Sequence, residues 1–548
     1  MNLDSFYSKI DKENFYLGIV SQVYRGNSFV QAENLSVLSD RKIRDEVLLP
    51  NTINYLVAVE DNQGIFIGEV YQSKVQDNDV VNQSINRGQF NKVFPELGIN
   101  IIGLMQDTEK FKLPGFRTVG INDRVYIANS KLIEKFQHSV QTKQYKREGM
   151  STPQKPLSNI AVLANTQDSY FSIQPNALLD RHLLVIGSTN SGKSTSSLAI
   201  LDKIIDNKIK LLVIDPTGEY RDAFPEKDFS RLTLGIDTFL PTGMVSMQQW
   251  EVLFQTNGNS QGAVLADAIT SLRFQMKSGL KAEVYKKVGK TVQHVQADMQ
   301  SLNDSDTSFN LLKLPEQINA ESVELGTKKD QLNQYVLNNF RANTNTWLVQ
   351  KVRHQMDYSN FKDFFVEEIK QGISLIDQID SFSKSTSGSL YINASQIGVS
   401  DGVGAMIIDL ITNQLINKPE TVLYPFVLFV DEIHRYTQFI NVDASVDSGL
   451  INVAREGRKK GMFLFLTTQS PLDVPKILYG QIGTLLIHRL TSNDDLQNIK
   501  SHLDERSQKQ IIGLNQGEAL LTSINLLRKI QLKFRPSSRI HHNKTPLL

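Results

Sequence analysis

The sequence predicts an α/β fold with a parallel central sheet, a helical insertion in that domain, and a small β-barrel at the N-terminus. Three observations lead to this prediction. Short apolar runs alternate with helical patterns from about residue 159. Many strand-like runs occur within residues 1–140, and none is seen between about 245 and 385. Alternation of strands and helices is typical of parallel sheets, because parallel neighbours need a long crossover connection.

The first 140 residues predict a small barrel or sandwich, and we favour the barrel. Apolar runs of strand length recur between turn-forming segments, and the segment Glu60 to Gly64 has the composition of a hairpin turn. The strand-like runs lie at 16–20, 28–32, 55–59, 65–70, 101–104 and 124–128. Many short strands in one region are typical of small closed or stacked sheets.

Residues 141–158 indicate a linker, because they are basic and contain Pro and Ser. Solvation is the expected role of the charges there, with ligand binding as the alternative. They belong to Lys143, Lys146, Arg147 and Lys155. The linker leads into the α/β domain at 159–535, and residues 536–548, which lack apolar periodicity, indicate a C-terminal tail.

The α/β domain divides into strands, helices and one insertion. Strands are expected at 182–186, 210–215, 388–394, 425–430, 462–467, 483–489 and 518–523, and helices after 193 and at 403–417, 446–460 and 494–503. The insertion, about 245–385, has helical patterns such as 261–276 and 360–379. Its basic residues between 273 and 290 indicate a solvated helix face or, alternatively, a DNA or partner surface.

The composition limits the chemistry. The chain has 548 residues with 40% apolar and 21% charged, as expected for a globular protein of two or three domains. Its net charge of +1 predicts no overall attraction to nucleic acid, although a ring can concentrate basic groups in a channel. The absence of cysteine excludes disulfides and thiolate chemistry. Without a signal-like N-terminus or an apolar run of ~20 residues, we expect a cytoplasmic protein with no membrane contact.

Residues 187–194 match the phosphate-loop pattern G-x-x-x-x-G-K-S, and they lie between a predicted strand and a predicted helix. With the next residue, the candidate nucleotide-binding set is Gly187, Ser188, Thr189, Asn190, Ser191, Gly192, Lys193, Ser194 and Thr195. Backbone N–H groups of such a loop surround phosphate oxygens. Lys193 is expected to contact the β and γ phosphates, and Ser194 is expected to hold Mg²⁺. The sequence therefore predicts binding of ATP with Mg²⁺.

Asp431 and Glu432 directly follow the apolar strand at 425–430. Asp431 is positioned to hold Mg²⁺ through water beside Ser194, and Glu432 to polarise an attacking water. A solvated strand end is the alternative, which the phosphate loop in the same domain disfavours. His434 follows the two acids, and its role stays open.

Two further pairs of residues are candidates for the catalytic site. Thr468 and Gln469, at the end of the 462–467 strand, are candidate sensors of the γ-phosphate, with ordinary strand-end polarity as the alternative. Arg455 and Arg458 lie at a helix end, where cations stabilise the helix dipole. For both residues, an equally good interpretation is an arginine finger, which neutralises the γ-phosphate in cis or from a neighbouring subunit.

The segment after the 210–215 strand contains a Pro-Thr-Gly break with Asp215 and Glu219 on either side. The carboxyl ends of parallel strands line the ligand crevice of such sheets, so both acids are candidates for the nucleotide site. A simple turn is an equally good interpretation.

In order and spacing, these motifs resemble the HerA family of the HerA–FtsK P-loop ATPases. The resemblance rests on Gly-Ser-Thr-Asn-Ser-Gly-Lys-Ser, Ile-Asp-Pro-Thr-Gly-Glu-Tyr, Val-Asp-Glu-Ile-His, Ala-Arg-Glu-Gly-Arg-Lys-Lys-Gly and Thr-Thr-Gln-Ser-Pro. It covers most of 159–535 apart from the insertion, and Leu514 to Leu520 resembles a late strand entry of the family. The chain departs from the family at Thr217, where His is more usual.

The resemblance implies a RecA-like ATPase that forms a homohexameric ring, hydrolyses ATP between subunits and threads double-stranded DNA through its channel. It favours the arginine-finger role, with Arg458 ahead of Arg455. It also implies a partner effector, either a nuclease or a sirtuin-like NAD-hydrolysing enzyme, with the N-terminal barrel as its platform. The stretch 435–447 is a candidate channel loop.

The expected function is therefore an ATP-driven double-stranded DNA translocase or helicase that works with such an effector in antiphage defence. One alternative is an ATP-binding ring that serves as a scaffold to assemble and regulate the effector. Another is a DNA end-resection motor in repair. A conjugative or segregation-type DNA pump is disfavoured, because such pumps usually carry membrane spans.

Overall fold

The computed structural model describes the chain except residues 1–2, 9–10, 25–26, 45, 107–109, 144, 147–152, 165–169, 258–259, 329–330, 358–359, 366–371, 398–400, 420–423, 438–447, 504 and 543–548. Two compact units make up the structure. One contains residues Met1–Leu178 and Leu520–Lys533, and the other contains Leu179–Ala519 and Phe534–Leu548.

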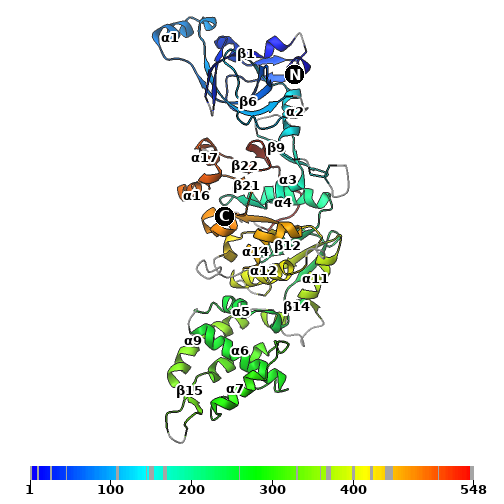
Figure 1. Cartoon of the computed structure of the whole chain (residues 1–548), viewed down its shortest axis with the longest axis vertical. Helices are drawn as coiled ribbons and strands as arrows, with labels where there is room; N and C mark the ends of the chain where they lie inside the picture. Colours follow the sequence, from blue (N-terminus) through cyan, green and yellow to red (C-terminus); the bar gives the residue numbers. More distant parts are fainter. Residues whose placement is uncertain are drawn as a thin grey trace, which may run out of the picture. The chain divides into compact units, whose positions relative to one another are not determined.

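The first unit contains a closed β-barrel, as predicted (Figure 1). Its strands are β1 (Tyr16–Val23), β2 (Ser28–Ala32), β5 (Leu56–Asp61), β6 (Gly64–Lys74), β7 (Glu96–Met105) and β8 (Arg124–Ile127), in the order β1-β2-β7-β6-β5-β8. β8 pairs with both β5 and β1, which closes the barrel. The β5–β6 hairpin turns between Asp61 and Gly64, as the turn-forming residues predict. Irregular pairing along β1 and β6 is typical of strands that curve into a small barrel.

A second group of strands belongs to the same unit. β10 (Tyr170–Ile173), β9 (Leu157–Leu163), β23 (Ile530–Lys533) and β22 (Glu518–Ser523) follow one another in that order. β9 is antiparallel to both β10 and β23. The segment 520–533 also contacts the barrel strand β6 and the residues that follow the barrel. Arg528 lies 3.7 Å from Glu69 and over the ring of Phe136. Residues 520–533, expected within the α/β domain, are thus packed with the N-terminal unit.

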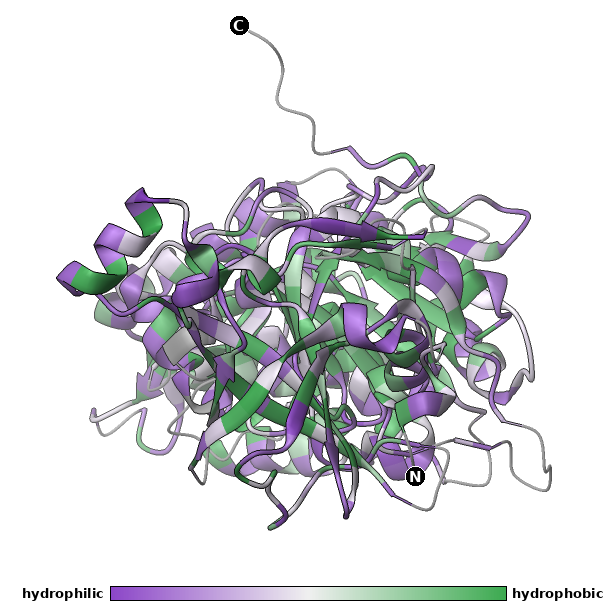
Figure 2. Cartoon of the chain, turned by 90° about the horizontal axis from the view of Figure 1, so that it is seen from above, coloured by the Kyte–Doolittle hydropathy of each residue, from purple (hydrophilic) through white to green (hydrophobic). Residues whose placement is uncertain are grey.

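Among the described residues, the main sheet of the second unit contains seven parallel strands, six of which were predicted; the remaining predicted strand, 518–523, corresponds to β22. The seven strands are β21 (Thr484–Ile487), β11 (Leu183–Ile186), β20 (Met462–Thr468), β19 (Phe426–Val430), β12 (Leu211–Asp215), β18 (Ser389–Asn393) and β13 (Phe229–Thr233), in that order. The strands β11, β12, β19 and β21 are buried along their whole length. Strands buried on both faces read as continuous apolar runs, and the interior strands in Figure 2 are predominantly hydrophobic. The sequence did not single out β13.

Helices of the second unit follow the predicted alternation. They are α4 (Lys193–Asp206), α12 (Asp401–Ile416), α13 (His434–Thr437), α14 (Gly449–Glu456), α15 (Lys476–Tyr479), α16 (Asn493–Asn498) and α17 (Glu505–Ile512). The predicted helix at 446–460 continues past α14 as a 3-10 turn over Gly457–Lys460. Of the described helices in the chain, none has the length and apolarity that a membrane crossing requires.

The insertion is mainly helical, and most of its helices group together in Figure 1, apart from the last one, which lies beside α12. It contains α5 (Met247–Leu253), α6 (Gln261–Lys277), α7 (Val292–Gln300), α8 (Leu314–Ala320), α9 (Asn339–Asp357), α10 (Phe361–Phe365) and α11 (Leu375–Lys384). The predicted helix over 360–379 was wrong, because β17 (Ile373–Ser374) pairs with β14 (Thr238–Phe239) and separates α10 from α11. Ser374 then caps α11 by accepting a hydrogen bond from the N–H of Asp377.

Several basic residues of the insertion are used inside it. Lys277 pairs with Asp306 at 2.7 Å, and Lys290 pairs with Asp298 at 3.3 Å. Lys287 forms a buried ion pair with Glu321, whose other carboxylate oxygen accepts hydrogen bonds from Ser271 and Gln317. These pairs favour a structural role for this part of the basic segment over a free DNA surface.

Candidate nucleotide and metal site

The phosphate loop joins the end of β11 to the start of α4, as its pattern predicts. Gly192 precedes the helix with φ +108°, and no side chain caps the helix there. A Cβ atom on Gly192 would lie 2.5 Å from the backbone nitrogen of Gly517, and one on Gly187 would lie 2.4 Å from Oγ of Ser191. Only glycine fits these two positions without rearrangement. An uncapped helix N-terminus with its positive dipole is suited to binding phosphate.

The other residues of the loop take different roles. The Ser188 hydroxyl donates a hydrogen bond to the carbonyl of Arg489 at 2.9 Å, so it faces the neighbouring chain segment. Asn190 accepts a hydrogen bond from Gln516 at 2.8 Å, and its backbone is left-handed with φ +64°. Ser191 is buried, whereas Ser194 and Thr195 are half-buried on the first turn of α4. The conformation of the loop is thus set by contacts to segments far away in the sequence.

The paired acids follow β19, and a threonine of the adjacent strand β20 positions both. The Thr467 hydroxyl donates a hydrogen bond to Oδ1 of Asp431 and accepts one from the backbone N–H of Glu432 at 2.9 Å. Glu432 has φ +48°, a left-handed conformation that is unfavourable for a residue with a Cβ atom. This bend in the chain lets two consecutive carboxylates face different parts of the site.

Lys193 and Glu432 form an ion pair between Nζ and Oε1, and their side chains are 8% and 17% exposed. The amide of Gln469 donates to the same Oε1 atom at 3.1 Å. Its own oxygen accepts a hydrogen bond from the Thr189 hydroxyl at 3.1 Å. The phosphate loop, the catalytic-base candidate and the sensor candidate are therefore linked in one network across the ends of β11, β19 and β20.

His434 belongs to this network, a role that the sequence left open. Its Nδ1 atom lies 3.1 Å from Oε2 of Glu432. Burial alone would raise the pKa of Glu432, but the nearby His434 imidazole and the Lys193 ammonium lower it to about 2. Burial raises the pKa of the neighbouring Asp431 to about 6, although Lys193 opposes the shift. Glu432 is therefore a carboxylate at neutral pH.

The donors at the predicted metal position fit Mg²⁺. They are the hydroxyl of Ser194 at the start of α4 and the carboxylate of Asp431 at the end of β19. Both are hard oxygen ligands of the kind that Mg²⁺ prefers beside substrate phosphates. Thr467 orients the Asp431 carboxylate, which is 8% exposed as a residue. When bound with a nucleotide, Mg²⁺ would neutralise phosphate charge at this position.

Asp215 has a structural role at the turn after β12. It is 1% exposed and accepts hydrogen bonds from the backbone N–H groups of Gly218 at 2.8 Å and Tyr220 at 2.9 Å. The Tyr391 hydroxyl also donates to it at 2.7 Å. The turn interpretation is therefore supported for Asp215, because these donors occupy its carboxylate.

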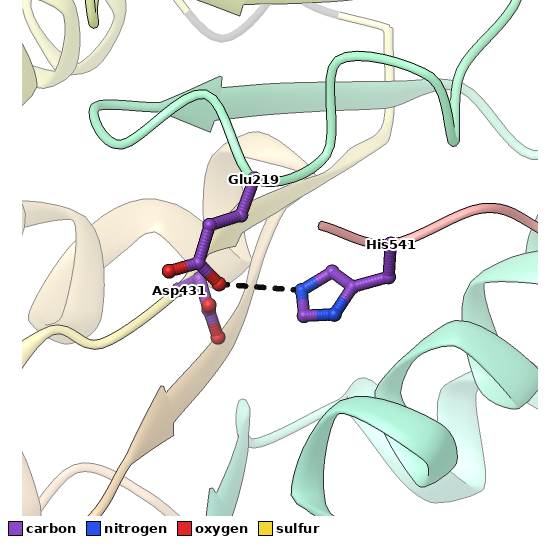
Figure 3. Close-up of side chains that lie close together, drawn as sticks. All are labelled: Glu219, Asp431 and His541. Atoms are coloured by element: carbon purple, nitrogen blue, oxygen red, sulfur yellow. Dashed lines mark ion pairs between the residues drawn. The ribbon is translucent and has the colours of Figure 1, made fainter. Parts of the chain in front are cut away.

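Glu219 instead faces Asp431, the predicted Mg²⁺ ligand. Figure 3 shows Glu219, Asp431 and His541 close together, from the loop after β12, the end of β19 and the C-terminal segment. Their ligand atoms lie within 4.8 Å of one another. His541 was not among the predicted site residues, because it lies in the segment 536–548, which was expected to be a tail.

Arg455 and Arg458 are both exposed at the end of α14 and in the turn that follows. Nε of Arg458 lies 3.2 Å from Oδ1 of Asp180. The described contacts therefore do not bring Arg458 to the paired acids within one subunit. Of the two sensor candidates, Gln469 faces the site, whereas the Thr468 hydroxyl donates to the carbonyl of Ser470 at 2.9 Å.

His488, at the end of β21, is a further residue that sequence analysis missed. Its Nε2 atom lies 2.7 Å from the Ser196 hydroxyl, and its Nδ1 atom lies 2.8 Å from the carbonyl of Glu518. Burial lowers its pKa to about 4, so the imidazole is neutral at neutral pH. A Cβ atom on Gly187 would lie 2.7 Å from Cβ of His488, so the His488 side chain packs directly against the start of the phosphate loop.

The candidate channel loop is described only in part. Residues 435–437 belong to α13, and 438–447 lie outside the described residues.

Comparison with known proteins finds similarity to one group of helicases. A family model described as helicase HerA, central domain, matches residues 159–415. A probable helicase of Methanocaldococcus jannaschii is 21% identical over 66% of this chain and 64% of its own length. The DNA double-strand break repair helicase HerA of Saccharolobus solfataricus is 22% identical over 62% of this chain and 61% of its length. The chain thus spans less than two thirds of these two relatives.

A relative with the same description in Pyrococcus furiosus is 21% identical over 85% of this chain and 87% of its own length. The family model includes the phosphate loop, and the structure adds a parallel sheet, a closed N-terminal barrel and paired acids at the end of a strand two positions from β11. Residues 159–415 of this chain are thus similar to the central domain of the HerA helicases.

Proposed function

We propose that this protein is an ATP-driven translocase or helicase acting on double-stranded DNA. The observation that carries the proposal is the network of Lys193, Glu432 and Gln469 at the ends of three adjacent strands. It combines a phosphate-binding cation, an ionised carboxylate and an amide in one place. Motors that couple nucleotide hydrolysis to movement need these three functions close together.

In this mechanism, the loop from Gly187 to Ser194 holds the phosphates through its backbone and the start of α4. Ser194 and Asp431 would hold Mg²⁺, which supplies charge neutralisation when bound. Lys193 exchanges its contact with Glu432 for a phosphate oxygen. The released carboxylate of Glu432 then orients a water molecule and accepts its proton.

Gln469 is suited to report the state of the site, because it contacts both Glu432 and Thr189. A change at either partner moves the end of β20, which continues into the segment after Ser470. We assign it the role of γ-phosphate sensor.

A neighbouring subunit is proposed to complete the site. Arg455 and Arg458 are exposed, and the Arg458 side chain is 49% exposed, which suits a guanidinium that acts on the next subunit. This geometry supports a ring with sites between subunits, and we propose a homohexamer with DNA in its channel. Relatives described as DNA double-strand break repair helicases support DNA as the substrate.

The biological setting is a separate part of the proposal. We propose a cytoplasmic motor of antiphage defence that works with a nuclease or a sirtuin-like NAD-hydrolysing effector on its N-terminal barrel. The barrel unit offers a groove of about 330 Å³ for contacts. The groove is lined by Gln31, Val75, Gln76, Val81, Lys92, Val93 and Phe94. The alternatives are a DNA end-resection motor and an ATP-binding scaffold for the effector.

The test is ATP hydrolysis by the purified protein with and without linear duplex DNA, with Glu432→Gln as the catalytic control. We expect DNA to stimulate hydrolysis, the stimulation to decrease with salt, and Glu432→Gln to abolish it. Nucleotide binding without DNA stimulation would contradict the motor and favour the scaffold. The scaffold further predicts that a complex with the effector survives Glu432→Gln.

A further inference from the structure

The C-terminal segment 534–542 is attached to the nucleotide-binding unit by a series of polar contacts. Arg539 forms an ion pair with Asp202 of α4 and donates a hydrogen bond to the carbonyl of Ala223 at 2.7 Å. The Ser537 hydroxyl also donates to Asp202. The segment that was expected to be a tail is thus held in place as far as residue 542.

Further contacts hold the end of this segment on the loop after β12. The backbone N–H of His542 donates to the carbonyl of Glu219 at 3.0 Å, and its side chain pairs with Asp222. The ring of His541 packs on the ring of Tyr220, with 4.6 Å between the centroids. The backbone and ring contacts therefore fix the direction in which His541 points.

His541 points toward the acids of the catalytic site (Figure 3). Its Nε2 atom lies 3.4 Å from Oε2 of Glu219, and its side chain is 7% exposed. Asp431 is 8% exposed as a residue, and one ligand atom of each of the three residues lies within 4.8 Å of the others. Three donors thus converge from three segments that are far apart in the sequence.

The chemistry of this group differs from that of the proposed Mg²⁺ position. Two carboxylates and an imidazole suit borderline divalent cations such as Zn²⁺ and Co²⁺, which accept both nitrogen and oxygen ligands. Mg²⁺ prefers oxygen ligands alone. Two carboxylates that lie close together also favour a cation between them, because like charges repel each other.

We propose that Glu219, Asp431 and His541 form a site for a transition-type divalent cation of the Zn²⁺ class. Such a cation draws the Asp431 carboxylate toward the C-terminal segment. Asp431 is also the proposed Mg²⁺ residue, so occupancy of the site competes with Mg²⁺-dependent hydrolysis. The regulatory part of this inference rests on the proposed function, whereas the binding site itself does not.

Binding is tested on the full chain without nucleotide or Mg²⁺. Zn²⁺ is titrated by calorimetry, and Co²⁺ by its visible absorption, against wild type, His541→Ala and Glu219→Gln. The matched control is His542→Ala, which removes an adjacent histidine that pairs with Asp222 instead. Far-ultraviolet circular dichroism checks folding, and Glu219→Gln serves if His541→Ala does not fold.

We expect one tight site in wild type and His542→Ala, and a loss of affinity of at least about tenfold in His541→Ala and Glu219→Gln, since these remove ligands rather than their outer partners. Equal affinity in wild type and His541→Ala, or no stoichiometric binding, would overturn the site. The binding measurement does not depend on ATP hydrolysis. A failure of the metal site can therefore be distinguished from a failure of the proposed function.

Competition is tested by ATP hydrolysis in excess Mg²⁺ with added micromolar Zn²⁺. We expect Zn²⁺ to inhibit wild type and His542→Ala more strongly than His541→Ala. Equal inhibition of all three would overturn the link between this site and Asp431.

Discussion

The ammonium of Lys193 is paired with the carboxylate of Glu432, so the proposed phosphate-binding cation and the proposed catalytic base form one ion pair. The pair keeps both charges compensated in a mostly buried position. A phosphate group that takes the lysine also frees the carboxylate. Binding of the substrate and release of the base are thus the same exchange of partners.

Glu432→Gln tests this exchange. We expect the variant to retain ATP binding, because Lys193 stays available, and to lose hydrolysis by about 10²–10⁴-fold, the usual contribution of a general base. Nucleotide affinity by calorimetry and steady-state turnover check the two parts. Glu226→Gln, an exposed acid of the same unit, is the matched control. Normal turnover in Glu432→Gln would show that another group is the base.

Gln469→Ala should lower turnover more than it lowers ATP affinity, because the side chain bridges Glu432 and Thr189 rather than the phosphate loop backbone. A double-mutant cycle with Thr189→Val measures the coupling. Residues in one hydrogen-bond network usually couple by about 0.5–3 kcal/mol. Strictly additive effects would argue against a shared network.

Arg458→Ala should reduce hydrolysis by about 10³-fold or more if this residue is the finger. Assembly, measured by light scattering, should be unchanged. Asp180→Asn, which removes only the partner of Arg458 within the subunit, should retain activity. Mixing Arg458→Ala with Lys193→Ala should restore part of the activity, because each variant supplies what its neighbour lacks. No recovery in mixed rings would exclude action in trans.

His488 predicts a pH dependence of stability. Burial lowers the pKa of its imidazole from 6.5 to about 4, so the unfolded chain binds a proton more readily than the folded chain. Its contribution is present above pH 6.5 and is lost as the pH falls toward 4, by roughly 3 kcal/mol at most. Urea unfolding of wild type and His488→Gln between pH 7 and pH 4 measures this, with a smaller loss expected in the variant. Parallel losses in the two proteins would contradict the prediction.

The predictable parts of this structure are those that local pattern determines. Strands buried on both faces must be continuously apolar, so β11, β12 and β19 are visible in the sequence. Lys193 and Glu432 are visible as well, since each follows such a strand within a recognisable motif. Their contact follows from the strand order of the sheet, in which only β20 separates β11 from β19.

The remaining features depend on contacts between distant segments. His488 and His541 are single polar residues without a surrounding pattern, and their partners lie far away in the sequence. Asp215 and Glu219 are both acids beside the same predicted turn. In the structure, however, the Asp215 carboxylate accepts hydrogen bonds from backbone N–H groups of that turn. No spacing rule distinguishes these two acids, because the difference lies in which way the chain turns after β12.

The left-handed backbone at Glu432 sets activity against stability at one position. Glycine adopts this conformation without strain, so Glu432→Gly relieves backbone strain of the order of 1 kcal/mol while it removes the carboxylate. The same substitution also removes the ion pair with Lys193, so the relief of strain is measured against Glu432→Ala, which loses that pair as well. A purified Glu432→Gly protein that melts later than Glu432→Ala would demonstrate the backbone strain directly.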